Sequence, residues 1–276
     1  MGAYRPFFTV RIFILNRNKV IKESMSKLTD RVDNQNIINL ARQNFENKQR
    51  SKLPTVIVNL ASQGKIYPET HPLSAGQLEM RYMTAYDEDV LTNASYIREG
   101  VVFDKLLETI IVTDIDVADI SPVDKDGLLI HARILAYGTE YPVTVADPKT
   151  KNILNRVVAL DKLQNKPFDL VSDKNGEFEY EVNESTHIKF TWVKDESDSD
   201  KISDTLKLAI REVNGDRKSA AIDEFIRYDF MAIDAKKFRK YMLNNMPGLD
   251  MTFEFEGEDG STFTASFRVG TDLFWF

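Results

Sequence analysis

The stretch from Leu53 to Val112 constrains the fold most, because it orders a strand, a turn, a second strand and two helices. A β-branched run at residues 56–60 is followed by Gln63-Gly64, a pair of turn-forming residues. Residues 77–83 then alternate polar and apolar side chains, the period of a half-buried strand, which places Arg81 on the polar face. This order predicts strands and helices packed together, with no catalytic signature among them.

The helices of this stretch carry recognisable signals. Thr84, with Asp87 three residues later, resembles a capping box in which Asp replaces the usual Glu or Gln. Asp87, Glu88 and Asp89 crowd the helix start, where carboxylates complement the helix dipole, so capping is favoured over catalysis. The next helix is predicted to bury its apolar residues Val102, Phe103, Leu106, Leu107 and Ile110.

Further elements follow along the chain. Ser121-Pro122 is a strong helix start, and Gly138 is the predicted left-handed stop of that helix. Strand alternation resumes from Tyr141 to Ala146. The other predicted helices span residues 33–50, 202–213, 218–231 and 234–246.

Two hairpins are predicted in the second half of the chain. The first lies between residues 168 and 193 and turns at Asp173-Lys174-Asn175-Gly176, and the second spans residues 251–267 and turns at residues 257–260. Strands near both ends must pair to bury their apolar faces. The predicted class is α+β, with a mixed or antiparallel sheet of N-terminal strands and the C-terminal hairpin, packed with a cluster of helices.

The sequence predicts a single α+β domain at residues 53–276, with a β-hairpin insertion at about residues 160–195. A helical arm is predicted at residues 25–52, and residues 1–24 form an N-terminal extension.

The extension has an apolar run from Phe7 to Leu15 that Arg11 interrupts, which is unlike a signal peptide. Two interpretations stay open: an added strand or arm, or a protein whose true start is Met25. A membrane-surface anchor is a less favoured alternative.

Composition narrows the function classes. A formal net charge of −7 argues against a general nucleic-acid binder, which usually has a basic stripe. The absence of cysteine excludes disulfides, thiolate zinc sites and cysteine nucleophiles. No run approaches the roughly 20 apolar residues that span a bilayer. We therefore expect no cofactor and no nucleic-acid, membrane or small-molecule partner.

Candidate chemical residues are few. Asp114 and Asp116 lie two residues apart in a predicted loop and can ligate magnesium, which supports a metal-dependent small hydrolase as the alternative function. The acidic segment at residues 195–200 lacks the Gly and Glu of a calcium-binding loop and is interpreted as a solvated helix start. The three histidines match no metal-ligand spacing: His71, His131 and His187.

The closing aromatic residues Phe274, Trp275 and Phe276 are the candidate interaction residues. Each such side chain buries about 150–250 Å², which corresponds to about 4–6 kcal/mol at about 25 cal/mol per Å². Exposure of all three would be costly, so they either cap the core, which is favoured, or insert into a partner.

Several segments occur in a characteristic order: LASQGKIYP, HPLSAGQLEMRYMTAYDEDVLTNASYIREG, VFDKLLETII, SPVDKDGLLIHARILAYGTEYPV, AKKFRKYMLNNMPGLDMTFEF and the closing DLFWF. Together they resemble the baseplate hub protein family of T4-like contractile-tailed bacteriophages, the gene-26 product family. The resemblance implies a non-enzymatic structural or assembly protein that binds other baseplate hub proteins. It also implies a location in the virion tail baseplate, or in the host cytoplasm during assembly.

One feature departs from that family. The resemblance implies Cys-Pro-x-Cys-like pairs after the central strand and inside the last hairpin. Here those places read Ala146-Asp147-Pro148 and, at residues 256–260, EGEDG. If relatives bind a structural zinc there, this chain is expected to use hairpin turn chemistry and packing instead.

Overall fold

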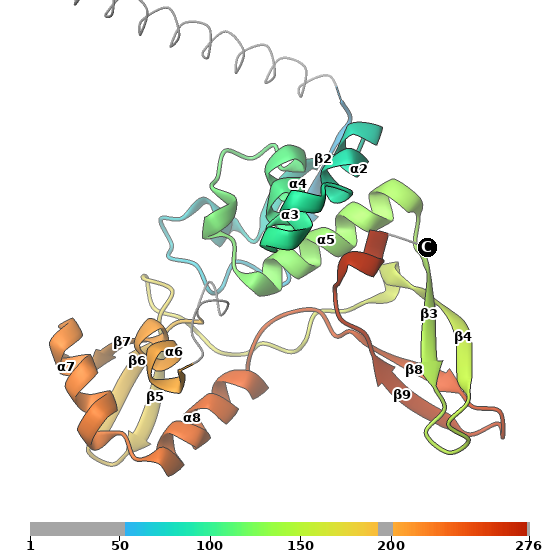
Figure 1. The fold of residues 1–276 in the computed structure, drawn as a ribbon. Helices are drawn as coiled ribbons and strands as arrows, with labels where there is room; N and C mark the ends of the chain where they lie inside the picture. Colours follow the sequence, from blue (N-terminus) through green and yellow to red (C-terminus); the bar gives the residue numbers. More distant parts are fainter. Residues whose placement is uncertain (1–52, 193–200, 275–276) are drawn as a thin grey trace, which may run out of the picture. The chain divides into compact units, whose positions relative to one another are not determined.

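The computed structural model describes residues 53–192 and 201–274, nearly all within one compact unit, Thr55–Phe276 (Figure 1). The predictions for residues 1–52, for the acidic segment 195–200 and for Trp275 and Phe276 lie outside the described residues. Within them, helices and antiparallel strands are both plentiful, which confirms the α+β class.

The α-helices of the described residues are α2 (Ala85–Leu91), α3 (Ala94–Glu99), α4 (Val102–Ile110), α5 (Pro122–Tyr137), α6 (Ile202–Ala209), α7 (Ser219–Glu224) and α8 (Ala232–Asn244). The strands are β1 (Thr55–Asn59), β2 (Gln77–Arg81), β3 (Glu140–Ala146), β4 (Ile153–Ala159), β5 (Phe178–Asn183), β6 (Thr186–Phe190), β7 (Ile210–Val213), β8 (Thr252–Glu256) and β9 (Thr262–Ser266).

Among the described residues the strands form four small antiparallel sheets instead of one shared sheet: β1-β2, β3-β4, β5-β6-β7 and β8-β9. The prediction that N-terminal strands pair with the C-terminal hairpin is therefore wrong. Each of β1 and β8 pairs with its neighbour in sequence, as in Val58 opposite Leu78 and Phe255 opposite Phe263. The connection between β8 and β9 is short and costs little loop-closure entropy, and the apolar faces of both sheets are buried against helices or the other hairpin.

The first core lies between β1-β2 and helices α4 and α5. The predicted apolar face of α4 is confirmed, with Leu106, Leu107 and Ile110 fully buried. The predicted boundaries of α5 are also confirmed, because the helix begins directly after Ser121 and ends directly before Gly138.

Arg81 is buried, which corrects its predicted place on the polar face of the second strand. Its guanidinium makes a two-pronged ion pair with Asp87 at the start of α2, with both N···O distances at 2.8 Å. The Asp87 carboxylate also accepts the N–H of Thr84 at 2.7 Å, the capping contact predicted from the sequence. It further accepts the hydroxyl of Thr109 on α4, so one buried carboxylate joins β2, α2 and α4.

A second buried carboxylate fixes the turn after β1. Asp124 in the first turn of α5 accepts the Ser62 N–H at 2.8 Å, the Ser62 hydroxyl at 2.7 Å and the Tyr67 hydroxyl at 2.7 Å. Gly64 in this turn has φ +77°, and a Cβ there would lie 2.5 Å from the Ser74 carbonyl oxygen. The turn therefore requires glycine at this position.

The second core is aromatic and lies between β5-β6-β7 and α8. Phe190 and Phe238 are fully buried, with ring centroids 5.2 Å apart. Trp192 packs at 4.7 Å from Phe178, and its indole N–H donates to the Met242 carbonyl.

Three predictions in this region need correction. The helix expected at residues 202–213 ends at Ala209, and β-branched Ile210 and Val213 continue as β7 beside β6. The turn at Asp173-Lys174-Asn175-Gly176 precedes β5, so the hairpin itself turns between Asn183 and Thr186. The helix expected at residues 218–231 is broken after α7 by a π-helical turn, Phe225–Asp229.

Candidate functional site

Phe274, one of the three predicted interaction residues, is buried in the first core at 2% exposure. Its ring lies 6.3 Å from that of Phe103. The preceding carbonyl, of Leu273, accepts the Arg133 Nε at 3.0 Å. Phe274 therefore caps the core, and interaction through Phe274, Trp275 and Phe276 stays a prediction.

The two carboxylates proposed for magnesium, Asp114 and Asp116, are both exposed, and His71, which was not proposed as a ligand, has a structural role. Asp116 accepts the Ala118 N–H at 2.9 Å and caps a 3₁₀ turn, Val117–Asp119. His71 stacks on Tyr67 with centroids 5.4 Å apart, and its Nδ1 accepts the Leu73 N–H. In the described ranges no three His, Cys, Asp or Glu side chains are grouped to hold a metal ion. No described helix is long and apolar enough to cross a membrane.

The most distinctive surface feature is the pair of hairpins β3-β4 and β8-β9, which lie side by side (Figure 1). Their facing sides meet through aromatic rings: Phe267 lies 5.6 Å from Tyr141 on β3 and 5.8 Å from Phe253 on β8. Val143 and Val145 on β3 are half-buried in the same cluster. The two hairpins therefore form a small two-layered structure with an apolar interior.

A carboxylate joins the tips of these hairpins. Asp147, only 2% exposed, accepts the N–H groups of Lys149 at 2.7 Å and Thr150 at 3.1 Å within its own loop, and that of Glu258 at 3.2 Å in the other hairpin. Gly257 allows the close approach, since a Cβ there would lie 2.7 Å from the Asp147 Oδ2. These are the two places where the family resemblance implies cysteine pairs, and the structure brings them into direct contact.

Replacement of Asp147 by alanine is expected to free the two tips. The backbone N–H groups, that of Thr150 first, hold the Asp147 pKa below its ordinary value, so the carboxylate stays charged at neutral pH. Hydrogen exchange should show loss of protection at the Glu258 amide, with the β3-β4 ladder still protected. Asp259→Ala, which removes the exposed ion pair to Lys149 and the turn contacts to Ser261 but leaves Asp147 in place, is the matched control. Unchanged protection at Glu258 in Asp147→Ala would contradict this role.

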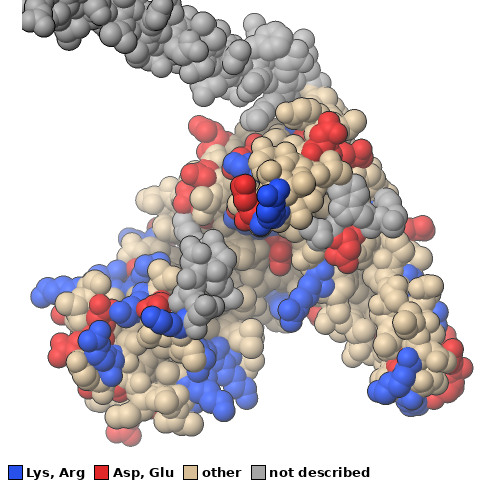
Figure 2. All heavy atoms as spheres, in the orientation of Figure 1, with Lys and Arg blue, Asp and Glu red and all other residues tan. Residues whose placement is uncertain are grey.

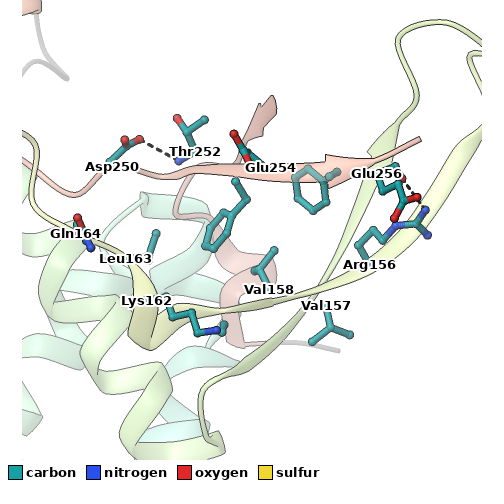
Figure 3. A pocket seen from close by; sticks show the side chains of 13 residues that line it. Arg156, Val157, Val158, Lys162, Leu163, Gln164, Asp250, Thr252, Glu254 and Glu256 are labelled. Carbon is teal, nitrogen blue, oxygen red and sulfur yellow. Dashed lines mark hydrogen bonds between the residues drawn. The ribbon is translucent and has the colours of Figure 1, made fainter. Parts of the chain in front are cut away.

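A groove of about 640 Å³ opens between β4 and β8 along one side of the hairpin pair (Figure 3). Val158 projects into the groove, whereas Val157 points away from it and Thr252 and Glu254 point away from β4. Arg156 crosses one end of the groove, where its Nη2 donates to the Glu256 carbonyl at 3.0 Å. At the other end the Asp250 N–H donates to the Gln164 carbonyl at 2.8 Å.

The outward side of β3-β4 is apolar or uncharged from Pro142 to Ala146 and along β4, and its one charged residue is Glu140 at the start of β3. Ile153 is 73% exposed and Val157 is 63% exposed, although both lie on a regular strand. Their partners across the ladder are Ala146 and Pro142, which are also exposed. In Figure 2, charged side chains gather instead at the hairpin tips and over α8. Residues 153–159 read ILNRVVA and do not alternate polar and apolar side chains, so no period-two signal marks this strand in the sequence.

The groove and the largely uncharged sheet face offer a binding surface. Comparison with protein families finds that residues 53–275 match the family described as T4 bacteriophage base plate protein. No curated protein and no solved structure matches the chain.

Proposed function

The chain belongs to the T4 bacteriophage base plate protein family, and we propose that it works in the hub of the baseplate as a structural or assembly protein. It is a baseplate structural protein of a phage tail, and its expected partners are other baseplate proteins. The finer assignment to the hub rests on the ordered segments that resemble the gene-26 product family. It acts through binding surfaces and not through bond-making chemistry.

The observation that carries a binding role is the hairpin pair. Two short sheets present a groove and a largely uncharged outer face with exposed Ile153 and Val157. An apolar surface of this kind costs free energy while it faces water, and partners commonly bind such surfaces. The hydrolase alternative gains no comparable support, because the Asp116 carboxylate caps a turn. The membrane-surface alternative rests on residues 1–24, which lie outside the described residues.

Affinity purification from infected cells tests the hub assignment. We expect the tagged chain to recover hub proteins in near-stoichiometric amounts under salt that removes weak, charge-based contacts. The tag belongs at the N-terminus, because Phe274 is buried. Recovery only of baseplate proteins from outside the hub would contradict the hub assignment. The assignment to the base plate protein family would still stand. Mass spectrometry of purified virions then separates a resident component, which is present, from an assembly factor, which is absent.

A further inference from the structure

We propose that the free edge of β4 binds an extended segment of a partner protein as an added strand, with one row of its side chains entering the groove between β4 and β8. This proposal deepens the proposed function and rests on it for the identity of the partner. The bound segment is uncharged and rich in β-branched residues, for the reasons that follow.

The register of the β3-β4 ladder shows which main-chain groups face outward. Leu160 N donates to Thr139 O, and Asp147 N donates to Asn152 O, so these two opposed pairs are hydrogen-bonded. Hydrogen-bonded and non-hydrogen-bonded pairs alternate in an antiparallel ladder. Val157, opposite Pro142, therefore belongs to a non-hydrogen-bonded pair and directs its N–H and C=O to the free edge of β4.

The two edges of the β3-β4 sheet differ in how well they are protected against pairing with a further strand. Pro142 lies in a non-hydrogen-bonded pair, so its missing N–H is on the free edge of β3, where proline blocks strand pairing. The β4 edge has no proline, and its outward-pointing residues Ile153, Asn155 and Val157 carry no charge. The Asn155 carbonyl on this edge already accepts the Arg156 Nη1 at 3.1 Å, so pairing is centred on Val157 and Ala159. An edge without proline beside exposed apolar side chains is a template for another strand.

The edge of β8 is less open to pairing than that of β4. In the β8-β9 ladder, Gly257 N donates to Ser261 O, so Thr252, Glu254 and Glu256 direct their main-chain groups outward. The Thr252 N–H already donates to the Asp250 side chain, and the Glu256 carbonyl already accepts from Arg156. Exposed carboxylates on Glu254 and Glu256 also disfavour an added strand.

The groove defines the chemistry of the bound segment. A strand beside β4 places alternate side chains next to Val158, toward the half-buried Phe253 and the buried Phe255 that line the groove. The other side chains lie beside exposed Ile153 and Val157 on the outer face. Val158 on the inner row and Ile153 and Val157 on the outer row are apolar neighbours, while Arg156 and Asn155 add one polar neighbour to each row. β-branched side chains pack best beside the apolar neighbours in such cross-strand pairs. The groove volume of about 640 Å³ is typical of binding pockets.

A synthetic peptide provides the direct test. The test peptide is a heptapeptide of alternating Val and Thr with two terminal Lys residues for solubility, and the control is its fully N-methylated analogue. We expect the test peptide to bind and to slow hydrogen exchange at the Val157 and Ala159 amides. The N-methylated analogue should bind at least tenfold more weakly, since it has the same side chains and no main-chain donors. No binding, or equal binding of both peptides, would overturn the proposal.

Matched variants locate the contact. Val157→Pro removes an N–H that faces the free edge and spares the ladder to β3, just as Pro142 already does across from it. Val157→Thr retains the N–H and the β-branched shape. We expect Val157→Pro to weaken peptide binding about tenfold and Val157→Thr to change it less than twofold. Protection of the Leu154, Arg156 and Val158 amides, which bond to β3, verifies that the variant strand is intact. Equal peptide binding by Val157→Pro with that protection retained would overturn the proposal.

The same variants separate this proposal from the proposed function. If wild-type and Val157→Pro chains recover hub proteins equally from infected cells, the strand-addition proposal fails and the hub assignment stands. If the wild-type chain recovers no hub protein, the hub assignment fails. The peptide measurements then test by themselves whether the β4 edge binds an added strand. Loss of hub proteins in Val157→Pro but not in Val157→Thr supports both.

Discussion

Replacement of Asp87 by alanine is expected to lower the free energy of unfolding by about 3–5 kcal/mol. Asp87 is fully buried and pairs with Arg81, which is itself only 6% exposed. Removal of the carboxylate leaves a buried guanidinium without its counter-charge and leaves the Thr84 N–H and Thr109 hydroxyl without their acceptor. The loss also separates β2, α2 and α4, which this side chain joins.

Urea unfolding followed by circular dichroism measures this effect, with Asp89→Ala on the exposed side of α2 as the matched control. The control should change the free energy of unfolding by less than about 0.5 kcal/mol, as exposed substitutions usually do. The double variant Arg81→Met, Asp87→Leu should recover part of the loss, because it removes both charges together. A loss below about 1 kcal/mol in Asp87→Ala would show that water reaches the pair.

This contact also determines part of the acid stability. Burial by itself raises the pKa of Asp87, but the hydrogen bonds from Arg81, Thr84 and Thr109 outweigh it and lower the pKa below the ordinary 3.8. The unfolded chain therefore binds the proton more tightly than the folded one. The stabilisation is complete above about pH 4 to 5 and is lost as the pH falls through the lowered value. Asp87→Ala should flatten this acid-dependent loss.

Asp124→Ala is expected to lower the free energy of unfolding by about 3 kcal/mol or more. The substitution leaves several buried donors without an acceptor, and each such donor costs about 1–3 kcal/mol. The Ser62 N–H and the Tyr67 hydroxyl both depend on this carboxylate. The turn that begins after β1 would lose its attachment to α5. Hydrogen exchange should therefore increase at the Ser62 and Gly64 amides before the chain unfolds as a whole.

A graded series tests that interpretation. Tyr67→Phe removes one hydroxyl, which donates to Asp124 and accepts the Ser121 N–H, and should cost about 1–2 kcal/mol. Burial, with the nearby Asp124 charge, raises the pKa of Tyr67 well above its ordinary value of 10. The contribution of Tyr67 to the free energy of unfolding is therefore complete below pH 10 and decreases as the pH rises above 10. Tyr67→Phe should remove this decrease at alkaline pH. Equal costs for Asp124→Ala and Tyr67→Phe would contradict a role for Asp124 beyond the tyrosine contact.

Local signals predicted local structure well. Ser121-Pro122 and Gly138 bound α5 because capping and helix termination depend on residues within a few positions. Thr84 and Asp87 likewise marked the start of α2. The alternation of residues 77–83 predicts that Arg81 is exposed. Arg81 is buried because it pairs with Asp87 on the following helix, and a strand pattern contains no information about such a partner. The pairing of β1 with β2 was missed because apolar alternation identifies a face and not the strand beside it.

The candidate site was harder to predict. Phe274 was favoured as a core residue from its cost of exposure, and it is buried. The open edge of β4 depends on the register that puts Val157 opposite Pro142, which only a paired structure reveals. The contact between Asp147 and Glu258 joins residues more than a hundred positions apart, beyond the reach of any short sequence pattern.

The late position of β8-β9 in the chain has a consequence for synthesis on the ribosome. Phe253, Phe255 and Phe274 complete the first core, yet they follow β3 and β4 by roughly a hundred residues. At about 5–20 residues per second, the inner face of the earlier hairpin waits on the order of 5–20 s for its cover. The nascent chain therefore exposes apolar surface until Phe274 emerges, and a chaperone or an assembly partner has the largest apolar surface to bind during this interval.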